Sequence, residues 1–124
     1  MLFRSHLHCY LNIPDTCGRD SLFQAEARRC KNILDNINHY KNDNHFIIFD
    51  ELFSGTNPEE AIISVFNFLK HINEKRNLSY LLTTHFYKIC IDLSKDNKIK
   101  NYNMKCDLIN NELFFTYKIG RAHV

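Results

Sequence analysis

Two adjacent acidic residues that directly follow a short apolar run are the first candidates for chemistry. The run is Phe46-Ile47-Ile48-Phe49, and Asp50 and Glu51 come immediately after it. A continuous apolar run is typical of a strand buried on both faces in a parallel sheet, and ligands of open α/β folds bind at the carboxyl edge of such a sheet. One carboxylate there can hold a divalent cation and the other can activate a water molecule. The alternative is a buried strand that ends in two solvated acids.

A histidine is predicted to lie at the same edge. Leu78 to Thr84 has the pattern of another buried strand, and His85 follows it. Neighbouring parallel strands end at the same edge of a sheet, so the imidazole would lie beside Asp50 and Glu51. There it could sense the γ-phosphate of a nucleotide, and the alternative is a structural hydrogen-bonding role.

Strands and helices alternate along the chain and must position these residues. A helix is predicted after Ser21, which stands in the N-cap position, and its apolar stripe ends at Ile37. A second helix begins at Pro58, a residue suited to the first helical turn. The remaining elements are strands at 6–13, 46–49 and 78–84, a short helix at 86–93, and an antiparallel pair at 99–106 and 112–119. This order predicts an α/β fold in one domain.

The composition is that of an ordinary globular protein. The chain has 124 residues, of which 44% are hydrophobic and 24% are charged, and this size fits one domain or part of one. The 16 basic and 14 acidic residues are spread along the chain, whereas a nucleic-acid-binding face usually has clustered Lys and Arg. Direct DNA binding by this segment is therefore not indicated.

The cysteines and the hydropathy indicate an intracellular protein without a membrane segment. The five cysteines are odd in number and lack C-x-x-C spacing, which disfavours a disulfide framework and a zinc ribbon. The longest uncharged apolar run, 61–69, is about half of the ~20 residues that a membrane helix needs. We therefore expect a reducing, intracellular compartment, either cytoplasm or nucleus.

Four blocks in a fixed order carry a resemblance to a known family. They are Gly18-Arg19-Asp20-Ser21-Leu22-Phe23-Gln24-Ala25-Glu26, then Ile33-Leu34, then Asp50-Glu51-Leu52-Phe53-Ser54-Gly55-Thr56, then Thr84-His85-Phe86. Their order and separations resemble the ATPase domain of MutS-family DNA mismatch-repair proteins over roughly residues 5–118. The segment 12–16 is most similar to the divergent MutS-like proteins of large DNA viruses.

The resemblance implies an ATP- and Mg²⁺-dependent site. The segment 46–51 resembles a Walker B motif, in which Asp50 would hold Mg²⁺ through water and Glu51 would activate the water that attacks the γ-phosphate. His85 matches the histidine that follows the switch strand of the family. Asp50, Glu51 and His85 are therefore the predicted metal-binding and catalytic residues.

The resemblance also implies a second MutS-type subunit, in a homodimer or a heterodimer. Ser21 matches the signature serine that reaches the ATP of the partner subunit, and Gly55 and Thr56 match the loop that contacts the opposite subunit. Phe23 and Glu26 match further signature positions. DNA would be bound by other domains of the intact parent.

Two features depart from the family pattern. Leu22 stands where a threonine is common, and Leu52-Phe53-Ser54 stands where a more basic, glycine-containing turn is common. We expect these differences to affect communication between subunits more than the chemistry of hydrolysis. The chain also lacks the phosphate loop G-x-x-x-x-G-K-[ST]. The expected fold is accordingly an ABC-type P-loop NTPase half-domain, a mostly parallel sheet flanked by helices with the Walker A part missing. ATP hydrolysis is predicted for the intact parent and left open for this chain.

The expected domain organisation has two parts. Residues 1–118 are interpreted as a partial MutS-type ATPase domain, with signature, Walker B, D-loop and switch histidine. Residues 119–124 are interpreted as an artefact, because Ile-Gly-Arg-Ala-His-Val is the translation of ATC GGA AGA GCA CAC GTC, which resembles a sequencing-library adapter.

Two other functions stay open from the sequence. One is another ABC-type ATPase, in chromosome maintenance or as a transporter subunit, although those usually show an LSGGQ-like signature. The other is a non-catalytic remnant that presents Ser21 and the Gly55 turn to a complete partner. The group His6, His8, Cys9 and Cys17 lacks a recognised zinc spacing and is interpreted as structural, and Ser54, Asp50 and His85 lack the G-x-S-x-G elbow of a hydrolase triad.

Overall fold

The computed structural model describes residues 5–11 and 21–122, which form parts of two compact units. The first unit ends at Phe86 and the second begins at Tyr87. The predicted site residues all belong to the first unit.

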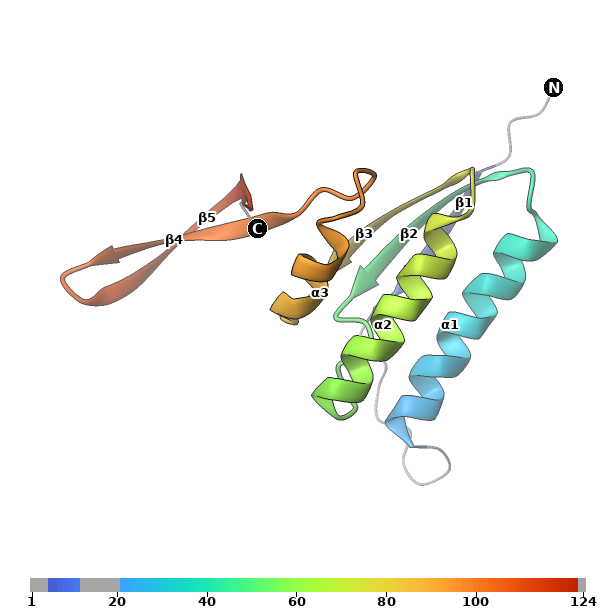
Figure 1. The fold of residues 1–124 in the computed structure, drawn as a ribbon, viewed down its shortest axis with the longest axis horizontal. Helices are drawn as coiled ribbons and strands as arrows, with labels where there is room; N and C mark the ends of the chain where they lie inside the picture. Colours follow the sequence, from blue (N-terminus) through green and yellow to red (C-terminus); the bar gives the residue numbers. More distant parts are fainter. Residues whose placement is uncertain (1–4, 12–20, 123–124) are drawn as a thin grey trace. The chain divides into compact units, whose positions relative to one another are not determined.

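The first unit is a parallel sheet covered by helices on one face. The strands β1 (Ser5–Tyr10), β2 (Asn44–Asp50) and β3 (Leu78–Thr83) pair in the order β1-β2-β3. Helix α1 (Leu22–His39) connects β1 to β2, and α2 (Pro58–Asn73) connects β2 to β3. Both connections cross the sheet in the same direction, so right-handed crossovers place both helices on one face, as Figure 1 shows. The α/β class with a parallel sheet and flanking helices is thus confirmed.

The core lies between this face of the sheet and the two helices. Its apolar side chains are almost fully buried, and they recur at helical spacing on α1 and α2 and alternate along β2. They include Tyr10, Cys30, Ile33, Ile37, Ile47, Phe49, Ala61, Val65, Leu69 and Ile72. The amphipathic periodicity predicted for both helices is confirmed.

The opposite face of the sheet carries exposed apolar side chains. Leu7 is 66% exposed, Phe46 43% and Leu81 58%, and they come from three adjacent strands. The prediction that the strand beginning at Phe46 is buried on both faces is therefore wrong, because both described crossover helices lie on the other face.

The N-cap residues determine where α1 and α2 begin. Ser21 is the N-cap of α1: its Oγ accepts a hydrogen bond from the Gln24 N–H, and the Gln24 Oε1 accepts one from the Ser21 N–H, both at 3.3 Å. Asn57 is the N-cap of α2, with Pro58 in the first turn as predicted. Strand β1 ends before Leu11, and the predicted strand residues 12–13 lie outside the described residues.

The turn after β2 has an uncommon backbone conformation and a buried apolar pair. Glu51 and Phe53 have φ values of 51° and 59°, in the left-handed region that residues other than glycine rarely adopt. Leu52 and Phe53 are 1% and 5% exposed. Burial of these two side chains fixes the turn.

This turn packs directly against the first turn of α1. A Cβ atom added at Gly55 would lie 2.1 Å from Cδ2 and 2.5 Å from Cγ of Leu22. The rings of Phe23 and Phe53 have centroids 5.6 Å apart. A side chain at position 55 would overlap Leu22 and displace it from its position.

Three histidines pack together near the amino ends of β1 and β2. The rings of His6 and His45 have centroids 5.0 Å apart, and His6 also packs on Tyr40 and bonds to Asp43 at 2.8 Å. The His45 Nε2 lies 3.0 Å from the Tyr40 carbonyl oxygen. A carbonyl only accepts, so this nitrogen carries the proton and the Nδ1 of neutral His45 is free to accept.

The proton between His8 and His45 therefore belongs to His8. The His8 Nε2–H donates to the His45 Nδ1 at 3.0 Å. Burial lowers the pKa of His8, and the nearby His45, His6 and Arg29 lower it further. Both described histidines of the predicted structural group thus bond to protein side chains, while Cys17 lies outside the described residues.

The second unit contains a short helix and a hairpin. Helix α3 (Tyr87–Leu93) is followed by the antiparallel strands β4 (Tyr102–Ile109) and β5 (Glu112–Arg121). Asn110 and Asn111 have φ values of 52° and 65°, the backbone of a type I′ turn. This turn sets the register next to it, and the register shifts between Met104 and Cys106. Strand β4 begins and ends later than the predicted range 99–106.

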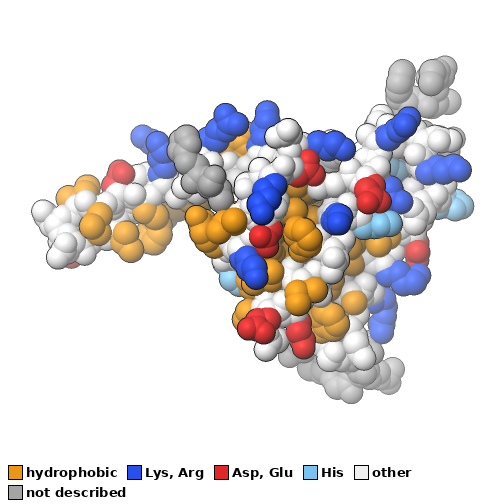
Figure 2. Space-filling view, viewed as in Figure 1, with side chains coloured by type: hydrophobic (Ala, Val, Ile, Leu, Met, Phe, Trp, Pro, Cys, Tyr) orange, Lys and Arg blue, Asp and Glu red, His pale blue; other side chains and the backbone are white. Residues whose placement is uncertain are grey.

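The hairpin exposes many apolar side chains on its surface, visible as orange atoms in Figure 2. Those at least half exposed are Tyr102, Met104, Leu108, Ile109, Leu113, Phe115, Tyr117 and Ile119. Strand β5 continues into residues 119–121, and the interpretation of 119–124 as an adapter translation stays a prediction.

We expect the His8 environment to make stability fall at acidic pH. The ordinary pKa of histidine is 6.5 and the pKa of His8 is lower in the fold, so below pH 6.5 the unfolded chain binds a proton that the folded chain resists. Stability is full above that pH and decreases as pH falls toward the folded pKa. Urea unfolding from about pH 8 to about pH 5 should show a smaller decrease in His8→Asn than in the native chain.

The exposed His71 supplies the matched control for this measurement. His71→Asn should keep the pH dependence of the native chain. If His8→Asn and His71→Asn gave the same curve, the His8 environment would not be the cause.

We also expect Gly55→Ala to destabilise the chain by about 1–3 kcal/mol, because the new methyl group overlaps Leu22. In a Leu22→Ala background the same substitution should cost much less, since the space is then free. Urea unfolding of the native chain, both single variants and the double variant gives the coupling free energy. Equal costs in both backgrounds would contradict the direct contact.

Candidate functional site

Thr83, at the end of β3, forms hydrogen bonds with both predicted acids at the carboxyl edge of the sheet. Asp50 and Thr83 are register partners, and the Thr83 Oγ1–H donates to the Asp50 Oδ1 at 2.6 Å. The Glu51 N–H donates to the Thr83 carbonyl at 3.1 Å and lies 3.2 Å from its Oγ1. Thr83 thus orients the Asp50 side chain and the Glu51 backbone together.

His85 lies at this edge, as the sequence predicts. Its Nδ1 is 3.5 Å from the Glu51 Oε1, and both side chains are more than half exposed. The Thr84 Oγ1 accepts a hydrogen bond from the Phe86 N–H at 3.1 Å, and the Phe86 ring packs on the imidazole with centroids 4.3 Å apart. The backbone turn and the Phe86 ring therefore set the position of the imidazole.

Asp50 and Glu51 offer the chemistry that Mg²⁺ requires. Both are exposed acids at the strand end, and Mg²⁺ in nucleotide sites is usually bound through one or two carboxylates while it keeps several waters. One oxygen of Asp50 is oriented by Thr83. The donor set thus fits a hydrated divalent cation.

The predicted partner-facing residues lie close to each other. Ser21 is exposed at the start of α1, and the next residue, Leu22, meets Gly55. Thr56 follows Gly55 and precedes Asn57, whose Oδ1 caps α2 by accepting from the Glu59 N–H at 2.9 Å. The structure thus brings Ser21 to the Gly55–Thr56 turn, while residues 18–20 of the signature block lie outside the described residues.

The two departures from the family pattern pack against the same pair of elements. Leu22, in place of the common threonine, contacts Gly55. Phe53, in the atypical turn, packs on Phe23. Both residues place apolar contact between the start of α1 and the turn after β2.

Sequence reasoning missed two residues that shape the site. The sequence assigns Thr83 no role beyond the strand end, and the structure pairs it in register with Asp50. Glu26 was matched to the signature block without a role, yet it is 3% exposed and its Oε1 accepts from the Gly55 N–H at 3.3 Å. The sequence signal for such a role is an acidic residue within the apolar stripe of α1.

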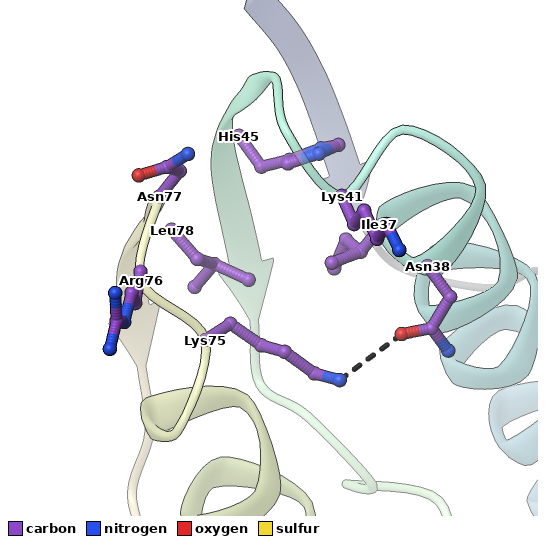
Figure 3. A pocket seen from close by; sticks show the side chains of 8 residues that line it. All are labelled: Ile37, Asn38, Lys41, His45, Lys75, Arg76, Asn77 and Leu78. Atoms are coloured by element: carbon purple, nitrogen blue, oxygen red, sulfur yellow. Dashed lines mark hydrogen bonds between the residues drawn. The ribbon is translucent and has the colours of Figure 1, made fainter.

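A hollow of about 180 Å³ lies at the other end of the sheet. His45 and Leu78, at the amino ends of β2 and β3, contribute to its wall, and the Lys75 Nζ donates to the Asn38 Oδ1 at 3.1 Å beside it (Figure 3). The acids lie at the carboxyl ends of these strands. The hollow is therefore separate from the candidate site.

Comparisons with known proteins agree with the predicted family. The family model "MutS domain V" matches residues 5–124. The DNA mismatch repair protein MutS of Phocaeicola vulgatus is 30% identical over 105 residues, 83% of this chain and 12% of that protein. The MutS proteins of Bacteroides fragilis and Macrococcus caseolyticus are 28% and 27% identical over 83% and 85% of the chain, which again cover 12% of each protein.

The chain thus spans 12% of the length of the curated relatives it matches. Of the helices that the structure describes, none has both the length and the apolar character needed to cross a membrane. The match of the MutS domain V model to almost the whole chain and the similarity to bacterial MutS proteins show that this chain belongs to the MutS family of DNA mismatch-repair proteins.

Proposed function

We propose that this chain supplies the Walker B, switch and signature parts of an ABC-type P-loop ATPase domain. The observation that carries the proposal is the arrangement of Asp50, Glu51 and His85 at one sheet edge, held by Thr83. Family membership supports the same assignment. The phosphate loop would come from a part of the protein outside these 124 residues, and residues 1–118 are the part of the domain proposed here.

The acids have different roles in this proposal. Asp50 would hold Mg²⁺, which neutralises charge on the phosphates of ATP when bound. Glu51 would orient the attacking water and accept its proton. Its backbone is already fixed by the bond from its N–H to the Thr83 carbonyl, so the carboxylate starts from a defined position.

The imidazole of His85 would link the acid to the nucleotide. Its Nδ1 is 3.5 Å from the Glu51 Oε1, which is long for a hydrogen bond, and such contacts often tighten only when the reactants are bound. The exposed ring can turn toward a γ-phosphate at the same edge. We infer that it senses this phosphate and orients Glu51.

Ser21, Gly55 and Thr56 would face a second MutS-type subunit. Ser21 is exposed and adjoins the turn through Leu22, so one surface can present all three residues. In a composite dimer, Ser21 would reach the ATP bound by the partner. The relatives are named DNA mismatch repair proteins, and we infer that the intact protein binds mismatched DNA through other domains and couples this binding to ATP.

We expect a longer protein that includes the phosphate loop to hydrolyse ATP with Mg²⁺, and Glu51→Gln to lower kcat by about 10²–10⁴-fold because the base is lost. ATP binding should persist in this variant, since Gln keeps the size of the side chain. Steady-state hydrolysis and nucleotide binding measured on the same preparations test this. The 124-residue chain alone should show no tight binding.

Glu74→Gln is the matched control, because Glu74 is an exposed acid at the C-cap of α2, at the opposite end of the helix from the Gly55–Thr56 turn. It should leave kcat unchanged, and Asp50→Asn should weaken the dependence on Mg²⁺. If Glu51→Gln hydrolysed ATP at the native rate, the catalytic assignment would be wrong. A longer protein without hydrolysis would favour the non-catalytic interaction role.

A further inference from the structure

The carboxylate of Glu26 is buried between α1 and the turn after β2. Glu26 is 3% exposed. Its Oε1 accepts a hydrogen bond from the Gly55 N–H at 3.3 Å, and its Oε2 is buried without a hydrogen bond within the described part of the chain. Buried carboxylates are costly unless they are paired or well hydrogen-bonded, so packing alone does not account for an acid at this position.

A second acceptor binds the same turn. The Tyr10 Oη accepts a hydrogen bond from the Phe53 N–H at 3.4 Å. Burial raises the pKa of Tyr10, and the nearby charge of Glu26 and a side-chain hydrogen bond with that carboxylate add to the rise. The phenol and the carboxylate are therefore neighbours. One acceptor from β1 and one from α1 therefore bind two amides of a single turn.

These acceptors bind a turn with an unfavourable backbone conformation. The turn contains two residues with positive φ, Glu51 and Phe53, and such backbone persists only where the surroundings over-determine it. The contact of Leu22 with Gly55 excludes a side chain there but is apolar and does not orient the amide. The hydrogen bond from the Gly55 N–H to Glu26 is what orients this end of the turn within the described part of the chain.

We propose that Glu26 is a positioning residue that locks the Ser21 end of α1 to the turn carrying Glu51 and Gly55. This inference rests on the proposed function. Ser21, which would reach the partner's ATP, and Glu51, which would act on the chain's own ATP, then move together. A displacement of Ser21 by the partner's nucleotide is transmitted through Glu26 to the turn.

Three substitutions separate the parts of this role. Glu26→Gln keeps the reach and an acceptor oxygen but removes the charge. Glu26→Asp keeps the charge but shortens the side chain, and Glu26→Met fills the volume without an oxygen acceptor. Glu74→Met, on an exposed acid at the C-cap of α2, is the control for an added methionine.

Amide hydrogen exchange of Gly55, measured by NMR on the 124-residue chain, tests the contact without ATP. Exchange should be about tenfold faster in Glu26→Asp and Glu26→Met, and close to native in Glu26→Gln and Glu74→Met. The amide of Ile33, buried in the middle of α1, should not change and reports intact folding. Native exchange of Gly55 in both Glu26→Asp and Glu26→Met would overturn the proposal.

Hydrolysis by the longer protein tests the consequence. We expect kcat to fall by about 10–100-fold in Glu26→Asp, as expected for misplaced catalytic groups, and to be rescued in Glu26→Gln. Because Gln keeps the acceptor, this rescue distinguishes positioning from a need for charge, and equal losses in Gln and Asp would overturn the proposal. If Glu51→Gln does not impair hydrolysis, the proposed function fails, whatever the exchange data show. If Glu51→Gln impairs it but Glu26→Asp does not, only the role of Glu26 fails.

Discussion

The pairing of β2 with β3 at their carboxyl ends is the constraint on which the site depends. It sets Thr83 opposite Asp50, and from this register follow the bond to the Asp50 carboxylate and the bonds to the Glu51 amide. A shift by one residue would turn every side chain of one strand to the other face. The alternation along β2 prevents this, because Ile47 and Phe49 are fully buried under the helices.

The turn after β2 connects this pairing to the rest of the unit. Leu52 and Phe53 are buried, so the chain bends back toward α1 instead of continuing along the strand direction. The bend brings Gly55 against Leu22 and Phe53 against Phe23. The apolar residues at the turn and at the start of α1 therefore pack against each other.

The sequence predicts most of the scaffold because its signals are local. Ser21 and Pro58 mark the helix starts, and hydrophobic patterning puts the strand ends at Phe49 and Thr84, each within one residue of the observed ends. The same reasoning fails where the outcome depends on what packs on a surface. Phe46 is apolar in a buried-looking strand, yet the two described crossovers run on the same side, so its face of the sheet stays exposed.

The hairpin and the acid of α1 show two further limits of prediction. The register of β4 and β5 depends on the left-handed backbone of Asn110 and Asn111, and a one-step change in the position of that turn moves both strand boundaries. Glu26 breaks the apolar stripe of α1, but periodicity does not reveal whether such a side chain faces solvent or a turn from a distant part of the chain. Its partner, Gly55, is 29 residues away.

This separation in sequence explains why site and fold form together. The bonds of Thr83 to Asp50, Glu26 to Gly55 and Tyr10 to Phe53 join residues 33, 29 and 43 positions apart. None can exist in an isolated helix or hairpin, because each needs two elements already docked on the sheet. The cluster of His6, His8 and His45, in contrast, involves the amino-terminal parts of β1 and β2, so protonation of His8 acts on the fold away from the acids. Conditions that loosen this cluster weaken the site through the shared strands, without any direct contact with Asp50 or Glu51.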